Sequence, residues 1–189
     1  MSRIPLLPLE NMTPEQRRVY DVFTGAGNRD GTRARGAPYQ LTLHCPEFTE
    51  KWQQLGTLLR HRNSLPPRLA ELAMLVTVRH WECQYAWRTH ERSAIKKGLS
   101  VTVIDAIRSG QRPAFDDSGE EAIYDYCREL HEEHFVSDHT YQRVLDRFGV
   151  VGVIELTALI GYYVMVAMTL NAHEYGLPPG VTPPLPTRT

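Results

Sequence analysis

The segment that decides the fold is Glu71-Leu-Ala-Met-Leu-Val-Thr-Val-Arg-His-Trp-Glu-Cys-Gln-Tyr-Ala-Trp-Arg-Thr-His90. Cys83 and His90 are seven residues apart, so two helical turns place them on one face, with roughly 10 Å of rise between them. Glu71 precedes Cys83 by 12 residues, which on a straight helix is about 18 Å and a third of a turn away. The three groups can meet only if the chain bends within Arg79–Glu82. The spacing therefore predicts two helices joined by a bend, with the three side chains in one pocket.

The same segment carries residue types used in acid–base and thiol chemistry. Imidazole changes charge near neutral pH, so His90 is a candidate general acid or base, and the Glu71 carboxylate could hold its tautomer. A bend would put Cys83 in the first turn of a new helix, where the helix dipole lowers the pKa of a thiol. The plainer alternatives are a small buried apolar residue for Cys83 and a surface histidine for His90.

Helix start and stop signals recur along the rest of the chain, and no run of β-branched residues alternates with period two. Thr13-Pro14-Glu15-Gln16, for example, is typical of a capping box with proline at the first helical position. These signals predict an all-α chain of about seven or eight helices. The helices are expected near 13–23, 46–61, 65 to the bend, the bend to 98, 100–110, 118–134, 137–149 and 150–176. Residues 25–38 are expected to form a loop.

The chain has 189 residues, which fits a single domain. We expect an extended N-terminal arm over 1–13 and an extended, proline-rich tail over 177–189. The 21 basic and 22 acidic side chains give a net charge of −1, without the basic excess of a nucleic-acid binder. Three scattered cysteines and the absence of a signal-peptide pattern at the start predict a reduced, cytoplasmic protein.

One apolar run is long enough to span a bilayer. Val150–Leu170 carries a single charge, at Glu155, but Tyr162 and Tyr163 lie near its middle and no basic cluster flanks it. A helix that is apolar all round can equally be the buried axis of a bundle or an oligomer. We therefore expect a buried helix and no membrane span, with contacts both to the protomer core and to another subunit.

Metal and cofactor signals are weak. His131 and His134 lie three apart, with His139 beyond them, and such a pair shares a metal only loosely without ligands from another element. No glycine-rich phosphate loop and no Ser-His-Asp pattern is present. We expect neither a metal nor an organic cofactor.

The spacing around Cys83 resembles that of the carboxymuconolactone decarboxylases and the alkylhydroperoxidase D-like (AhpD-like) proteins. The peroxidase branch carries Glu-x11-Cys-x2-Cys-x3-His, and Glu71, Cys83 and His90 fall on three of its four positions. The fourth position, the second cysteine, is Ala86. Because a two-cysteine peroxidase needs a second thiol to resolve the sulfenic acid, we expect no efficient turnover of that kind and no disulfide at Cys83.

The decarboxylase-like branch commonly has Tyr-Glu-Trp-x-x-His at this place. Tyr85, Trp87 and His90 match it, while Ala86 replaces the glutamate. The resemblance extends over most of the chain, to a bacterial subgroup of this branch. Its other matching segments are Ile4-Pro5-Leu6-Leu7, Leu65-Pro66-Pro67-Arg68, Leu130-His131 followed by Val136-Ser137-Asp138, and Leu170-Asn171-Ala172.

The resemblance implies an all-α fold with an internally duplicated helical unit, in homotrimers or homohexamers. A faint repeat fits that duplication, because Glu71-Leu72 to His90-Glu91 has a counterpart from Glu155-Leu156 to His173-Glu174. The implied activity is decarboxylation of a small acidic lactone or a related intermediate of aromatic breakdown.

In that activity, His90 is the expected acid or base, oriented by Glu71. Tyr85 and Trp87 are expected to contact the substrate, and Arg79, Arg88 or Arg92 to hold its carboxylate. Two alternatives stay open: a one-cysteine thiol peroxidase that uses Cys83, and a non-catalytic oligomer that binds a ligand.

Overall fold

The structure is a computed structural model that describes residues 2–24 and 38–186. Within these residues it contains α-helices, one short 3-10 helix and no strand, so the expected all-α fold is confirmed. The elements are η1 (Leu9–Asn11), α1 (Pro14–Thr24), α2 (Tyr39–Thr42), α3 (Pro46–His61), α4 (Pro67–His80), α5 (Gln84–Lys96), α6 (Val101–Arg108), α7 (Ser118–Glu132) and α8 (Asp138–Ala172).

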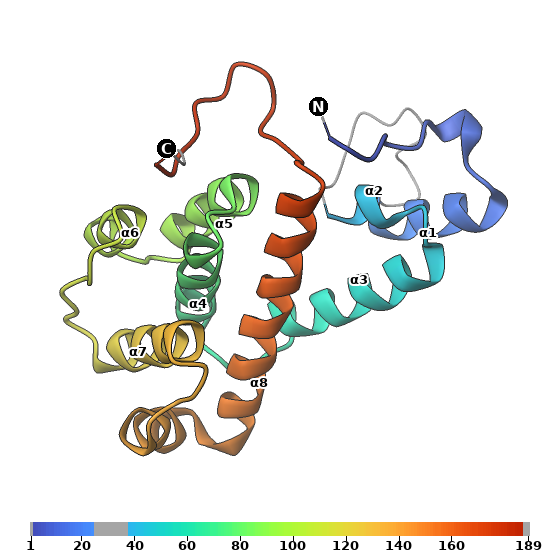
Figure 1. Ribbon diagram of the computed structural model, residues 1–189. Coiled ribbons are helices and arrows are strands. Elements are labelled where there is room, and N and C mark those ends of the chain that lie inside the picture. The colour runs from blue at the N-terminus through green and yellow to red at the C-terminus, as the bar shows by residue number, and fades with distance from the viewer. Residues whose placement is uncertain (1, 25–37, 187–189) are drawn as a thin grey trace.

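Helix α4 is the central element of the fold. It packs against α5, α6, α7 and α8, and Figure 1 shows the long helix α8 running beside it. The ten consecutive residues Leu69–Val78 of α4 are buried, as neighbours on all sides require. Helix α3 leads away from α8 toward α1 and α2, which form a smaller group at one end of the molecule (Figure 1).

The close approach of α3 to α8 depends on a glycine. A Cβ atom on Gly56 would lie 2.1 Å from the hydroxyl oxygen of Tyr162 and 2.7 Å from that of Tyr39. No side chain fits there without displacing these rings. The two tyrosine hydroxyls are 2.9 Å apart and form a buried hydrogen bond, so Gly56 lets α3 reach the aromatic part of α8.

Local signals placed most helix boundaries correctly. The capping box of α1 forms, with the Gln16 amide N–H donating to Thr13 Oγ1 and the Thr13 N–H donating to Gln16 Oε1. Helix α7 is capped by Asp117 rather than Ser118, because the Asp117 carboxylate accepts from the Gly119 amide. The short elements η1 and α2 were not predicted, and because η1 lies within residues 1–13, the N-terminal arm is extended only in part.

Helix α8 contains the break expected at Gly149. This glycine has a φ of 67° and a ψ of 179°, a conformation available to glycine without steric cost, and it separates 138–148 from 150–172. The apolar part ends at Ala172, before the predicted end at Gly176. The two halves of the proposed repeat differ in structure. Glu71 to His90 crosses the turn between α4 and α5, whereas Glu155 to His173 follows the single helix α8 and its C-cap.

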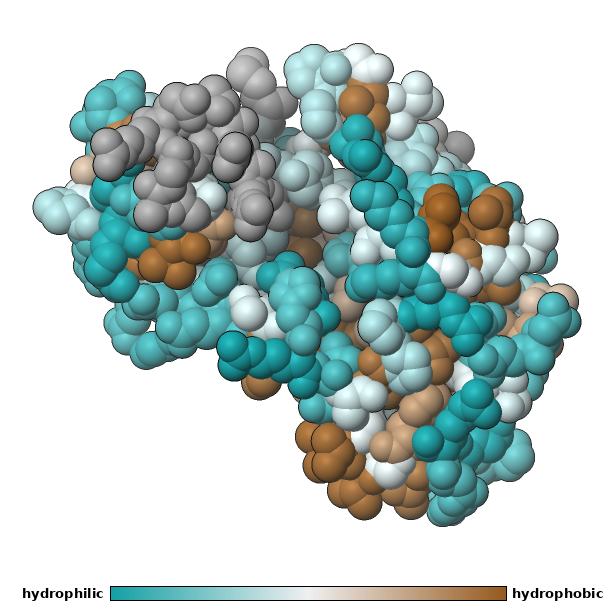
Figure 2. Space-filling model, turned by 180° about the vertical axis from the view of Figure 1, so that it is seen from behind, coloured by the Kyte–Doolittle hydropathy of each residue, from teal (hydrophilic) through white to brown (hydrophobic). Residues whose placement is uncertain are grey.

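Within a single chain, Val150–Leu170 is buried on one side only, and the predicted contact of its other side with another subunit stays a prediction. Val151 is 60% exposed, Ile154 62% and Met168 50%, and these positions fall on one side of the helix. The exposed apolar and small residues recur at spacings of three, four or seven positions, at Val151, Ile154, Ala158, Gly161 and Met168. Seen from behind, the surface carries several hydrophobic patches among hydrophilic side chains (Figure 2). Helix α4, not α8, is the fully buried axis.

Length and composition alone would allow α8 to cross a membrane. It is the only such helix among the described residues, and half of its most apolar window is buried inside the protein. Since the core helix of a soluble protein meets the same criterion, this is weak evidence for a membrane span.

Three segments of the sequence prediction, the loop, the N-terminal arm and the C-terminal tail, are described only in part. Residues 25–37 of the expected loop, Met1 of the arm and 187–189 of the tail lie outside the described residues. The tail from 177 to 186 has no helix or strand, as expected. It returns to the body of the protein near its end, where Leu185 is buried.

Candidate active site

The predicted bend between α4 and α5 is present. Helix α4 ends at His80, helix α5 begins at Gln84, and Glu82 between them has a φ of 51°. The Cys83 amide donates to the Val78 carbonyl at 2.9 Å, which closes the turn. Asn171 at the end of α8 donates its side-chain amide to the Trp81 carbonyl at 2.6 Å. The turn reverses the chain, so α5 packs back along α4.

This reversal brings Glu71 and His90 into contact. Glu71 Oε2 lies 2.8 Å from His90 Nδ1. The other carboxylate oxygen, Oε1, accepts from Ser93 Oγ and from Lys97 Nζ, both at 2.7 Å. Both side chains are largely buried, with exposures of 4% for Glu71 and 12% for His90. The prediction that these residues meet is confirmed.

The surroundings of Glu71 keep it ionised. Burial by itself raises the pKa of the Glu71 carboxyl, but hydrogen bonds from His90, Lys97 and Ser93 outweigh burial and lower the pKa to about 2. An ionised carboxylate can only accept a hydrogen bond, so Nδ1 of His90 carries the proton toward Glu71. The remaining ring nitrogen, Nε2, is then the atom that can exchange a proton with a ligand.

His90 lines a small cavity of about 70 Å³ between α3, α5 and α8. Its ring meets the Tyr163 ring edge to face, with 4.7 Å between the centroids. Arg60 and Tyr162 form the side of the cavity opposite α5, and Tyr85, Ala86 and other apolar groups complete it. The cavity therefore joins an imidazole, a guanidinium and tyrosine side chains in one small space.

Arg60 is held in this cavity by neutral partners. Its Nε donates to the Gly56 carbonyl and its terminal nitrogen donates to the Tyr39 hydroxyl, both at 2.9 Å. No ion pair between described residues includes Arg60. The buried Tyr163 hydroxyl lies close to the same guanidinium without an aligned hydrogen bond. Arg60 thus keeps its positive charge available to an anionic ligand.

Cys83 does not have the activated thiol that its place beside a helix start suggested. It occupies the N-cap of α5 and is only 1% exposed. Burial raises the pKa of the Cys83 thiol to about 11, although the backbone N–H groups of Ala86 and Tyr85 act in the opposite direction. Desolvation outweighs the helix terminus here, so the expected lowering of the pKa is wrong and the thiol is protonated at neutral pH.

Cys83 also lines a different cavity from His90. This larger space, of about 510 Å³, lies between the α4–α5 turn, the end of α8 and the C-terminal tail. Tyr85 and Leu170 line both cavities, so the two adjoin each other. The expected single pocket is therefore two neighbouring cavities, with Glu71 buried behind His90.

The C-terminal tail forms the outer wall of the larger cavity. The side-chain amide of Gln84 donates to the Leu185 carbonyl at 3.1 Å and accepts from the Leu185 amide at 2.9 Å. The lining is mainly aromatic and apolar, from Trp81, Tyr175, Leu177, Val181, Pro183 and Pro186. Glu82 and Glu174 also line it, and no arginine or lysine does so among the described residues. This space favours the uncharged part of a ligand.

The structure separates the five residues expected to bind substrate, and Arg92 lies with Arg88 in a surface groove. Tyr85 lines the His90 cavity, as expected. Trp87 is fully buried and donates its indole N–H to Glu91, so it supports α5 rather than contacting a ligand. Arg79 lines a cavity between α4, α6 and α7, and Arg88 lines a surface groove along α5. Arg79, Arg88 and Trp87 therefore do not serve the His90 cavity in this structure.

Several site residues were missed by the sequence reasoning. Ser93 and Lys97 follow His90 by three and seven residues on α5, and helical spacing alone could have placed them on its face. Tyr162 and Tyr163 stood out in the middle of an apolar run, which is a signal of a polar contact in the core. Arg60 is one of several basic residues near the end of α3, and nothing local marks it.

Of the histidines considered for metal binding, His131 has other contacts. Nε2 of His131 lies 3.1 Å from Thr77 Oγ1, and its ring stacks on that of His80 with 4.6 Å between the centroids. Within the described residues, no three histidine, cysteine or carboxylate side chains gather at a spacing that would hold a metal ion.

Comparison with known proteins gives two findings. Residues 46–129 match the carboxymuconolactone decarboxylase family, and this range includes Glu71, Cys83 and His90. No curated protein sequence matches the chain. A crystal structure of a protein of unknown function from Agrobacterium tumefaciens, with the suggested name antioxidant defence protein AhpD, is similar in fold. The two share 15% identity and a TM-score of 0.65, over 72% of this chain and 94% of that one.

Proposed function

We propose that this chain, whose residues 46–129 match the carboxymuconolactone decarboxylase family, is a lyase that decarboxylates a small acidic lactone or a related ring compound, with His90 as its proton donor and acceptor. The buried contact between Glu71 Oε2 and His90 Nδ1 carries the proposal. It fixes one ring nitrogen, so that the other can serve the cavity that also holds Arg60.

The size and charge of the two cavities support one orientation of such a substrate. The space beside His90 is too small for a whole lactone, while the adjoining space of about 510 Å³ is roomy and mainly apolar. Arg60 is the cation at the narrow end, and Glu82 and Glu174 line the wide end. In our proposal the carboxylate and the reacting ring oxygen point toward Arg60 and His90, and the uncharged remainder lies under the C-terminal tail.

The reaction then needs two things from the protein. When the bond between the carboxyl carbon and the ring breaks, carbon dioxide leaves and the bonding electron pair stays on the conjugated ring system. Arg60 stabilises the negative charge that develops there. His90, as imidazolium, delivers the proton from Nε2 to the product, and the ionised Glu71 stabilises the imidazolium before that transfer.

Peroxide chemistry is the second candidate, because the suggested name of the structural neighbour points to antioxidant defence. The protonated, buried Cys83 and the alanine at position 86 argue against it. A non-catalytic ligand-binding oligomer is the third.

One experiment separates these three functions. The protein is incubated with carboxymuconolactone while carbon dioxide release is measured, and separately with cumene hydroperoxide and dithiothreitol while peroxide loss is measured. Wild type and Cys83→Ser are compared. We expect carbon dioxide release in both proteins. Peroxide loss that disappears in Cys83→Ser would support the peroxidase, and inactivity in both assays would support the ligand-binding protein.

We also propose that the protein assembles with copies of itself in the cytoplasm through the exposed side of α8. The apolar positions there follow the spacing of a helix-packing surface, and the exposed Leu55 and Leu58 lie on the adjacent helix α3. Light scattering of wild type and Ile154→Glu tests this. We expect an oligomer for wild type and a smaller species for the variant, and a monomeric wild type would contradict the proposal.

A further inference from the structure

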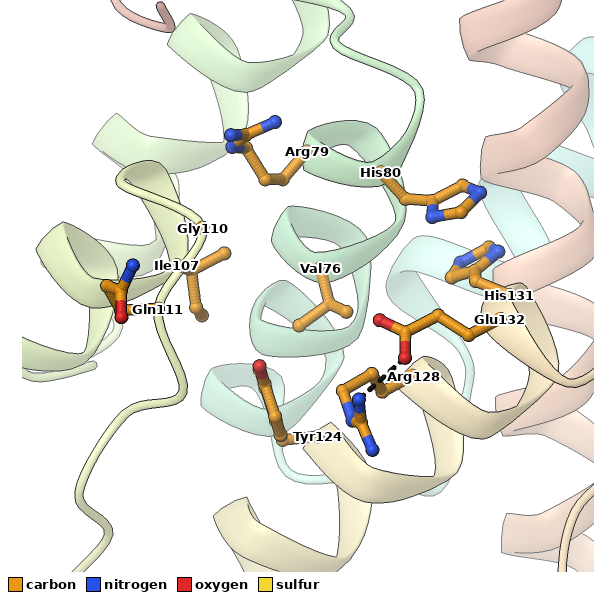
Figure 3. Close-up of a pocket in the computed structure, with 10 residues that line it drawn as sticks. All are labelled: Val76, Arg79, His80, Ile107, Gly110, Gln111, Tyr124, Arg128, His131 and Glu132. Atoms are coloured by element: carbon orange, nitrogen blue, oxygen red, sulfur yellow. Dashed lines mark hydrogen bonds and ion pairs between the residues drawn. The ribbon is translucent and has the colours of Figure 1, made fainter.

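A separate cavity of about 180 Å³ lies between α4, α6 and α7 (Figure 3). It shares no lining residue with the cavity of His90. Val76 and Ile107 give it apolar walls, and Arg79 and Arg128 enter from opposite elements, α4 and α7. The hydroxyl of Tyr124 points toward Val76 and Ile107, and Arg79 and Arg128 lie at opposite ends of the cavity (Figure 3).

The charges around this cavity do not balance. Arg79 donates from Nε to the Arg108 carbonyl at 2.9 Å, and no ion pair between described residues includes it. Arg128 pairs with Glu132 at 2.6 Å. The two guanidinium groups and the single carboxylate leave one positive charge in surplus.

The other titratable groups at the cavity do not remove this surplus. Burial, together with the neighbouring His80, lowers the pKa of His131 to about 4, so His131 is neutral at pH 7. Burial raises the pKa of Tyr124, which keeps its hydroxyl protonated and able to donate. His80 is exposed at the rim. The cavity therefore offers a cation and a hydroxyl donor but no matching anion.

A half-buried guanidinium without a counterion is stabilised when a carboxylate binds to it, because the planar fork of arginine pairs with two oxygens at once. The size of the cavity limits the rest of the ligand. A cavity of about 150 Å³ lined by apolar side chains accommodates benzene. The space here is slightly larger and has apolar walls, so it suits one ring or a short chain.

We propose that this cavity is a second ligand site, which binds a small carboxylate whose apolar part is no larger than a single ring. Arg79 holds the carboxylate, Tyr124 donates a hydrogen bond, and Val76 and Ile107 contact the apolar part. The sequence analysis selected Arg79 as a carboxylate-binding residue. In this proposal Arg79 binds a carboxylate in a cavity outside the candidate active site.

Isothermal titration with benzoate tests the proposal, with benzamide as the neutral ligand of the same shape. We expect saturable binding of benzoate and binding of benzamide weaker by about tenfold or more. Arg79→Gln should weaken benzoate binding by about tenfold or more, and Arg79→Lys by several-fold because lysine lacks the fork. Arg147→Gln is the matched control, since Arg147 pairs with Asp117 away from the cavity, and it should bind as wild type does.

Arg60→Gln distinguishes this site from the candidate active site. Loss of benzoate binding in Arg60→Gln but not in Arg79→Gln would overturn the proposal, as would the absence of saturable binding up to about 10 mM benzoate. Arg79→Lys preserves the charge and supplies the comparison if Arg79→Gln does not fold. None of these outcomes depends on carbon dioxide release, so this site and the proposed activity are tested independently.

Discussion

Glu71 and His90 lie 19 residues apart in the chain, yet Glu71 Oε2 and His90 Nδ1 are 2.8 Å apart across the α4–α5 turn. The carboxylate is held from its other oxygen by Ser93 and Lys97, so it cannot rotate away without losing three partners. The turn at Trp81–Cys83 makes this contact possible, because on one straight helix the two groups would lie far apart.

Replacement of Glu71 tests whether this contact matters for the chemistry. We expect Glu71→Gln to lower kcat for carbon dioxide release by about 10- to 100-fold, with KM changed by less than about threefold, because a neutral amide stabilises the imidazolium poorly. Glu91→Gln is the matched control, since Glu91 adjoins His90 in sequence but pairs with Arg108 and Trp87. An equal loss in both variants would indicate a structural effect on α5 only.

Replacement of Arg60 tests how the substrate is held. Arg60→Gln should raise KM for a carboxylate substrate by about tenfold or more, because Arg60 is the cation of the His90 cavity. Arg88→Gln removes a charge of the same kind from the surface groove along α5 and should leave KM unchanged. Steady-state kinetics of the two variants measures the difference. A rise in KM for Arg88→Gln alone would indicate that Arg88, as the sequence suggested, binds the substrate carboxylate.

The pKa of Cys83 predicts a characteristic reactivity. With a pKa of about 11, the thiolate fraction at pH 7 is about 10⁻⁴, and it rises about tenfold for each pH unit up to pH 10. Alkylation by iodoacetamide, followed by peptide mass analysis, should show this rise for Cys83. The exposed Cys45 in the same sample shows that the reagent is active. Fast alkylation of Cys83 at pH 7 would contradict the buried, protonated thiol and favour the peroxidase.

His131 makes folding stability depend on pH in a defined window. Its pKa falls from 6.5 to about 4 on folding, so the unfolded chain binds the proton more tightly. The free energy of unfolding is therefore highest above pH 6.5 and decreases as the pH falls toward 4. After allowance for partial exposure, we expect a loss of about 1–2 kcal/mol. Urea unfolding at pH 7 and pH 5 should show this loss in wild type and in His134→Gln, an exposed control, but not in His131→Gln.

The sequence predicted the relation between Glu71 and His90 because it depends on spacing. Helix geometry fixes where residues 71, 83 and 90 point, and the three can approach only through a bend at the polar segment between the helices. Residues that cap or stop a helix act on neighbours in the sequence, so Thr13 and Gly149 correctly marked helix boundaries.

The properties of Cys83 and α8 could not be read in the same way. The pKa of Cys83 depends on its burial, and the cavity wall around it comes from the end of α8 and the tail near Leu185, about a hundred residues away in the chain. Similarly, apolar composition showed that α8 has hydrophobic sides but not which helices cover them. Arg60 lines the cavity of His90 because α3 packs on α8 at Gly56, a tertiary contact without a local sequence signal.

The rate of carbon dioxide release by His90→Gln, relative to wild type, tests the central claim most directly. Glutamine retains a polar group of similar reach but cannot carry a proton at neutral pH. The account predicts that wild type releases carbon dioxide from carboxymuconolactone and that kcat of a folded His90→Gln falls by about 10²- to 10⁴-fold. A folded His90→Gln that keeps the wild-type kcat would contradict it.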